Sequence, residues 1–137
     1  MADVFTKQKR SWIMSRIRSE NTSIDRKMRE MLSEARLKFV MYPDLYGKPD
    51  FQVGKKTLVF CDGDFWHGYR YAEKKRPAKK YWREKIERNM KRDRQVSRRL
   101  RRDGWSVLRI WEHDIKRKPE TCKRKILRKV AERKHLR

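Results

Sequence analysis

The chain has 137 residues, of which 41 are Lys or Arg and 18 are Asp or Glu, so its formal net charge is +23. Only two cysteines occur, without a paired spacing, and no apolar stretch approaches the ~20 residues of a membrane span. These features argue against a disulfide framework, a thiolate zinc site and a membrane protein. The first residues lack a signal-peptide core, so a cytoplasmic location is expected.

The large positive charge costs the folded state self-repulsion, so a polyanionic partner is expected. Nucleic acid is the leading candidate because Lys and Arg occur in nearly every segment. A membrane-surface protein would instead concentrate them on one amphipathic helix. The alternative is a solvated surface that promotes solubility.

No repeat or linker divides the chain, so a single domain over residues 1–137 is predicted. Hydrophobic periodicity and turn residues predict a series of helices and strands. In chain order these are a basic N-terminal arm over residues 1–20 with a helix at 6–17, a helix at 21–37, a strand at 38–42, a hairpin of strands 51–53 and 57–61, a basic loop at 68–80, a long helix at 81–102, a strand at 105–111, and a basic C-terminal region 117–137 with a helix at 119–134.

The helical segments have apolar residues at helical spacing, so each predicts an inward face. In the long helix this face consists of Trp82, Ile86, Met90, Asp93, Ser97 and Leu100. In the last helix the predicted inward residues are Ile126, Leu127 and Val130. The order of helices and strands predicts a mixed sheet flanked by helices.

The stretch VFCDGDFWHG, residues 59–68, places acids and a histidine directly after an apolar strand. A turn centred on residues 54–56 would pair positions whose numbers sum to about 111, which puts Asp50 opposite Cys61 and beside Asp62. Two carboxylates there repel each other unless a cation lies between them, and Mg²⁺ prefers carboxylates, water and phosphate oxygens. A turn-forming Asp50 and a solvent-facing Asp62 remain the alternative interpretation.

Two further residues are unusual for their positions. His67 follows the acids and could accept a proton from an attacking water, although a structural histidine is the alternative. Asp93 lies on the apolar face of the long helix, where an acid needs a partner. That partner could be one of the many Arg side chains, or Asp93 could support a metal site.

Four segments, KPDF, VFCDGDFWHG, YWREKIERNMKRDR and GWSVLRIWEHD, resemble the very short patch repair (Vsr) endonucleases, in the same order and with similar gaps over residues 2–116. The resemblance implies an α/β fold of the restriction-endonuclease-like, PD-(D/E)xK type, with a mixed central sheet flanked by helices. It also implies a Mg²⁺-dependent endonuclease that nicks one strand 5′ to a mismatched base, with T:G expected. A related nuclease acting on damaged, branched or unmodified DNA, or a non-catalytic DNA-binding module, would be the alternative.

The resemblance assigns roles to the acids and the histidine. Asp50 matches the central metal-binding aspartate, Asp62 restores a carboxylate typical of restriction-enzyme metal sites, and Cys61 matches a position whose backbone carbonyl contacts metal. His67 matches the histidine that activates water. Asp25 matches a glutamate that supports the site, and Asp93 an aspartate near the catalytic histidine. One or two Mg²⁺ ions are implied.

The resemblance also implies how DNA is recognised. Phe65, Trp66 and Trp82 match aromatic residues that wedge into the duplex beside the mismatch, where a base step is easiest to open. Trp12 and Lys48 are further predicted DNA contacts. The alternative for the three aromatic residues is an ordinary core position. The expected partner is double-stranded DNA with a mismatch, bound by a monomer, and a mismatch-repair protein partner remains open.

The sequence departs from the family at its structural zinc. The cysteine and histidine positions of the family site hold Asp64, Tyr69 or Tyr71, and His113 here, so the thiolates are absent. We therefore predict no structural zinc, although Asp64 and His113 could form half a site. The loop at 68–80 would then be held by packing or stay mobile until DNA binds.

Overall fold

The computed structural model describes residues 22–64, 67–69 and 80–135. A four-stranded mixed sheet with the order β1-β2-β3-β4 forms its centre. The strands are β1 (Phe39–Met41), β2 (Phe51–Val53), β3 (Thr57–Asp62) and β4 (Ser106–Trp111). The first three strands pair antiparallel, and β4 pairs parallel to β3. The predicted helix at 6–17, with Trp12, lies outside the described residues, as do Phe65, Trp66 and Tyr71.

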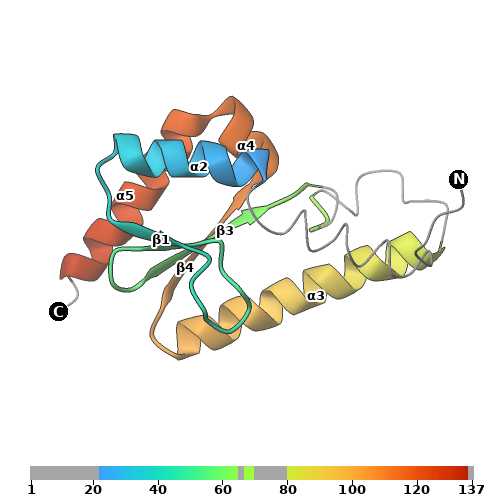
Figure 1. Ribbon diagram of the computed structural model, residues 1–137. Helices are drawn as coiled ribbons and strands as arrows, with labels where there is room; N and C mark the ends of the chain where they lie inside the picture. Colours follow the sequence, from blue (N-terminus) through green and yellow to red (C-terminus); the bar gives the residue numbers. More distant parts are fainter. Residues whose placement is uncertain (1–21, 65–66, 70–79, 136–137) are drawn as a thin grey trace, which may run out of the picture.

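Helices cover both faces of the sheet (Figure 1). One face carries α2 (Ser23–Glu34), α4 (Glu112–Arg117) and α5 (Pro119–His135), whose apolar side chains share a core cluster with the strands. The long helix α3 (Lys80–Arg102) connects β3 to β4 and packs on the other face, where Val96 and Leu100 contact Leu58, Phe60 and Val107. The mixed sheet flanked by helices is thus confirmed.

Local sequence signals explain where the helices begin and end. Thr22 caps α2, because its hydroxyl accepts a hydrogen bond from the Asp25 backbone N–H at 3.2 Å. Gly104, at φ +97°, ends the turn after α3 in the left-handed conformation that glycine tolerates best. These boundaries fall within a few residues of those predicted.

Two details of the predicted fold are wrong, and one helix was missed. The hairpin pairs positions whose numbers sum to 110, as in Phe51 opposite Val59, so Asp50 is not directly opposite Cys61. On α5 the predicted inward residues Ile126 and Val130 do pack in the core, but Leu127 is 39% exposed, and the buried Cys122, four residues before Ile126, takes its place. The short helix α4 was not predicted, because Ile115 is its single buried residue and gives no periodicity.

Within the part of the chain that the structure describes, no helix combines the length and the apolar character that crossing a bilayer requires.

Candidate active site

Side chains from several elements converge around the carboxyl end of β3. Asp25 comes from the first turn of α2, and Asp50 directly precedes β2. Cys61 and Asp62 are the last two residues of β3, and His67 follows in the loop. Figure 1 shows this strand end pointing into the space between α2 and α3. The site therefore depends on the packing of both helical layers against the sheet.

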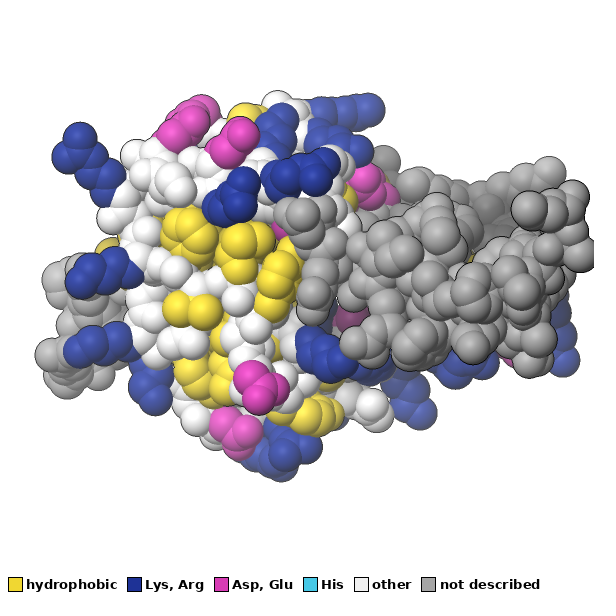
Figure 2. All heavy atoms as spheres, viewed as in Figure 1, with side chains coloured by type: hydrophobic (Ala, Val, Ile, Leu, Met, Phe, Trp, Pro, Cys, Tyr) yellow, Lys and Arg dark blue, Asp and Glu magenta, His cyan; other side chains and the backbone are white. Residues whose placement is uncertain are grey.

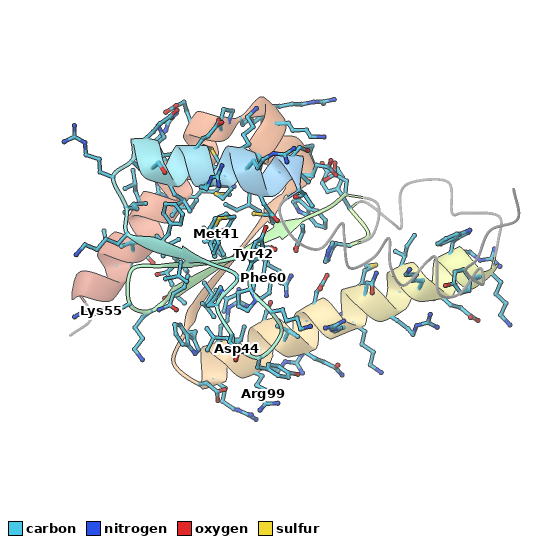
Figure 3. All side chains as sticks on the ribbon, in the orientation of Figure 1. Met41, Tyr42, Asp44, Lys55, Phe60 and Arg99 are labelled. Carbon is cyan, nitrogen blue, oxygen red and sulfur yellow. The ribbon has the colours of Figure 1, made fainter. Side chains whose placement is uncertain are left out.

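The first group, called the carboxylate cluster here, consists of Asp25, Asp50 and Cys61. One potential ligand atom from each lies within 4.8 Å of the other two. The Tyr42 hydroxyl donates a hydrogen bond to Asp25 Oδ2 at 2.7 Å, and the Cys61 backbone N–H donates to Asp50 Oδ2 at 2.7 Å. Tyr42 is labelled in Figure 3, at the end of β1. These contacts aim both carboxylates at a shared space.

Burial makes this cluster unfavourable for negative charge. Asp25 is 2% exposed, and burial raises its pKa although hydrogen bonds from Tyr42 and Thr22 oppose the rise. Burial and the charge of Asp25 raise the pKa of Asp50 to about 7. Among the described residues, the hydrogen bonds to these two acids come from neutral donors. Two carboxylates in this setting fit a divalent cation.

Cys61 contributes differently from the two acids. Burial and the neighbouring carboxylates raise the pKa of its thiol well above the usual value, so the thiol stays protonated. A neutral thiol is a poor ligand for Mg²⁺, which prefers oxygen. The residue's backbone carbonyl remains the group that could contact a hard cation there.

The second group, called the histidine cluster here, consists of Asp62, His67 and Asp93, again with ligand atoms within 4.8 Å of one another. His67 Nδ1 lies 2.5 Å from Asp93 Oδ2 and 3.7 Å from Asp62 Oδ1. Burial lowers the pKa of His67, but the hydrogen bond to Asp93 and the charges of both acids outweigh it and raise the pKa above 6.5. With Nδ1 bonded to Asp93, Nε2 is the ring nitrogen left for proton transfer.

Gly68 allows His67 to approach α3. Its φ is +74°, and a Cβ at this position would clash with the Met90 side chain. Both the backbone conformation and the close contact therefore favour glycine. Gly68, directly after His67, thus allows the loop to pack against Met90 of α3, the helix that also carries Asp93.

Arg109 on β4 is a site residue that the sequence analysis missed. Its Nη1 donates to both oxygens of Asp62, at 3.0 and 3.3 Å, and its Nε donates to Ser97 Oγ at 2.7 Å. The signal that could have found it is a charged residue between apolar neighbours in a predicted strand. The partner of Asp93 was left open, and its carboxylate contacts His67 and lies 3.5 Å from Arg109 Nη1.

The predicted site residues therefore fall into two groups. Asp50 is joined by Asp25 and Cys61, whereas Asp62 lies with His67 and Asp93. Of the predicted DNA contacts that are described, Lys48 is exposed in the loop before β2, and Trp82 is half-buried near the start of α3, with its ring edge-on to Tyr81.

Three described residues at the positions where the resemblance implied a zinc site, Asp64, Tyr69 and His113, contact one another. His113 Nδ1 lies 2.9 Å from Asp64 Oδ1, and the Tyr69 ring packs on His113 and Trp111 with centroids 4.1 and 5.1 Å away. Asp64 and His113 are thus partners, and Tyr69 packs on the start of α4. These contacts hold residues 64 and 69 next to the sheet.

The described surface is strongly basic. Lys and Arg side chains are spread over the face shown in Figure 2, around a central group of hydrophobic side chains. On the outer side of α3, exposed cations recur along the helix at Arg88, Lys91, Arg92, Arg94, Arg98 and Arg99. Such a surface suits a phosphate backbone, whose contacts supply affinity independent of sequence.

Comparison with known proteins identifies relatives over most of the chain. The family described as DNA mismatch endonuclease Vsr matches residues 2–73. The chain is 41% identical over 96 residues to the type II nicking enzyme V.NmeDIP of Neisseria meningitidis serogroup C, covering 67% of this chain and 65% of that protein. It is 39% identical over 116 residues to DNA mismatch endonuclease Vsr of Escherichia coli (strain K12), covering 82% and 74%. It is 34% identical over 136 residues to the type II nicking enzyme V.NmeAIP of Neisseria meningitidis serogroup A, covering 96% of each.

A solved structure supports the fold. The catalytic domain of the homing endonuclease I-Bth0305I superposes with a TM-score of 0.58 at 20% sequence identity, covering 81% of this chain and 96% of that one. At this identity the likeness bears on the fold alone. The predicted restriction-endonuclease-like fold is confirmed.

Proposed function

Because the chain belongs to the Vsr family of DNA mismatch endonucleases, it is an endodeoxyribonuclease, and we propose that it uses Mg²⁺ to nick one strand 5′ to a mismatched base, T:G above all. The observation behind this proposal is the carboxylate cluster beside the histidine cluster at the end of β3. A site for a divalent cation and a site for a general base are the two parts that metal-assisted phosphodiester hydrolysis needs.

Asp50 and Asp25 would hold the cation, with the Cys61 backbone carbonyl as a third oxygen. Bound Mg²⁺ would supply positive charge beside the scissile phosphate. The protein's own contribution is to keep the two carboxylates oriented, through the hydrogen bonds from Tyr42 to Asp25 and from Cys61 to Asp50. Because burial raises the pKa of both carboxylates, a bound cation would favour their charged forms, which couples metal binding to proton release.

His67 would accept the proton of the attacking water at Nε2. Asp93 accepts the hydrogen bond from Nδ1 and so fixes the ring's orientation and tautomer. The negative charges of Asp93 and Asp62 would also stabilise the imidazolium that forms after proton transfer. Asp93 thus acts as a positioning residue for His67.

Recognition of the mismatch is assigned to aromatic residues. We propose that Phe65, Trp66 and Trp82 enter the duplex beside the mispaired base, because opening a mismatched step costs least. Trp12 and Lys48 would contact the DNA nearby. The basic surface of α3 would hold the phosphate backbone of double-stranded DNA, and the enzyme would act as a monomer.

The test is strand nicking on end-labelled duplexes that carry each single mismatch, damaged bases, branches or no lesion. We expect cleavage of one strand 5′ to the mismatched base of a T:G pair, dependent on Mg²⁺ and abolished by chelator. Asp50→Ala should abolish nicking while duplex binding persists, whereas Asp44→Ala, an exposed acid of the same loop, should retain both. Full nicking by Asp50→Ala at saturating Mg²⁺ would overturn the metal assignment, and preference for another lesion would overturn the T:G assignment.

A further inference from the structure

The two acidic groups at the end of β3 differ in how their charge is balanced. In the histidine cluster, the Arg109 guanidinium donates hydrogen bonds to Asp62. In the carboxylate cluster, the acids accept hydrogen bonds from neutral donors of the described chain. We propose that Arg109 is a built-in cation that takes the place of a second metal ion, so that the chain binds a single divalent cation, at Asp25 and Asp50. This inference rests on the metal site of the proposed function and fixes the number of ions and the role of Asp62.

The contacts of Arg109 occupy all parts of its guanidinium. Nη1 donates to both Asp62 oxygens, Nε donates to Ser97 Oγ, and Nη2 donates to the backbone carbonyl of Asp93 at 3.2 Å. The guanidinium also lies 4.1 Å from the centroid of the Phe60 ring, on its face. A planar group held at every nitrogen has no alternative position nearby. Arg109 is therefore a fixed part of the site.

Its position matches that of a bridging cation. Nη1 lies 3.0 Å from Asp62 Oδ1 and 3.5 Å from Asp93 Oδ1, so one nitrogen approaches the carboxylates of both acids. A divalent ion bound to the same oxygens would face a guanidinium that does not lose its charge, at a distance of a few ångströms in a largely buried site. The repulsion would oppose binding, and the two acids already have their counter-ion.

Cys61 and Asp62, the last two residues of β3, have different roles in this arrangement. Successive side chains on a strand point to opposite faces, so Cys61 faces the carboxylate cluster and Asp62 faces Arg109 and α3. Asp62 then anchors Arg109 instead of binding metal. Through its bond to the Asp93 carbonyl, Arg109 ties α3 to β4 at the residue that orients His67.

Titration of the full-length protein with Mn²⁺, followed by the electron paramagnetic resonance signal of free Mn²⁺, gives the number of bound ions. We expect one ion per wild-type chain. Asp50→Asn should weaken its binding at least 100-fold, and Asp62→Asn should leave one ion bound with affinity within about three-fold of wild type. Arg109→Leu should expose the histidine cluster and raise the count to two. Arg99→Leu, an exposed arginine of α3 that stacks on Tyr46, is the matched control and should leave one.

Each result decides a separate question. Two ions on the wild-type chain, or loss of the single ion in Asp62→Asn, would overturn the inference while leaving a metal-dependent nuclease intact. Loss of Mn²⁺ binding from wild type itself would instead overturn the metal site of the proposed function. If circular dichroism shows that Arg109→Leu is unfolded, the number of ions bound by the wild type and by Asp62→Asn still tests the single-ion inference. A count that stays at one in folded Arg109→Leu would contradict the claim that Arg109 replaces an ion.

Discussion

Asp50 allows the metal assignment to be tested through stability, independently of cleavage. In the metal-free protein, burial and the charge of Asp25 raise the pKa of Asp50 from 3.8 to about 7. Between these values the folded chain holds a proton that the unfolded chain has lost, so the free energy of unfolding falls as the pH rises. The destabilisation is small near pH 4 and fully present above about pH 7.

We expect Asp50→Asn to remove this destabilisation, because Asn is neutral and its side-chain oxygen can still accept the hydrogen bond from Cys61 N–H. One pKa unit corresponds to about 1.4 kcal/mol, so the raised pKa corresponds to at most ~4 kcal/mol near pH 8. Asp25 titrates together with Asp50 and can hold part of the bound proton. The increase in the free energy of unfolding expected from Asp50→Asn is therefore roughly 2–4 kcal/mol. Near pH 4 the gain should be below about 1 kcal/mol.

The assay is urea unfolding followed by Trp fluorescence, in chelator and in saturating Mg²⁺, near pH 4 and pH 8. Mg²⁺ should stabilise the wild type near pH 8 and leave Asp50→Asn unchanged, because only the wild-type site binds the ion. Asp44→Asn should behave as wild type, since Asp44 is exposed. The reasoning fails if Asp50→Asn is less stable than wild type near pH 8 in chelator, or if Mg²⁺ stabilises both equally.

Three further predictions concern the base, the carboxylates and the wedge. The hydrogen bond and the charge of Asp93 raise the pKa of His67. Asp93→Asn should therefore slow nicking and shift the acidic limb of the pH profile of nicking to lower pH. An acidic limb at an unchanged pH would show that His67 is not the base. Tyr42→Phe loses the hydrogen bond to Asp25, worth about 1.5 kcal/mol to a charged group, so the Mg²⁺ concentration for half-maximal nicking should rise ~10-fold; an unchanged value would exclude Tyr42 from the metal site. Trp82→Ala should lower the preference for mismatched over matched duplex roughly ten-fold in competition binding, whereas an unchanged preference with a lower melting temperature would assign Trp82 to the core.

The fold was predictable where local patterns repeat over several turns or strands. The 23 residues of α3 show helical periodicity over their whole length, and Gly104 marks the turn after it. The hairpin of β2 and β3 followed from its turn, but its register was wrong by one residue, because the turn length alone does not specify the pairing. The six residues of α4 are too few for a periodic signal.

The candidate site was predictable in composition and less so in arrangement. Asp50 precedes β2, Asp62 ends β3 and His67 follows it, so the hairpin was expected to bring all three to the same end of the sheet. Arg109 reaches Asp62 from β4, 47 residues further along the chain, through the parallel pairing of β3 with β4. Only the tertiary packing that assembles both helical layers determines which acid meets which partner.

The charge of the carboxylate cluster has a consequence for the order of binding. Without metal, the buried acids favour protonation, and an incoming phosphate would add a further negative charge near them. A divalent cation relieves both repulsions at once, so DNA and metal should each bind more tightly when the other is present. Arg109 cannot supply this coupling, because its charge is permanent and already engaged by Asp62. Under the proposed mechanism, an exchangeable cation would therefore make cleavage depend on substrate and metal together, whereas Arg109 would keep His67, the proposed base, in position throughout.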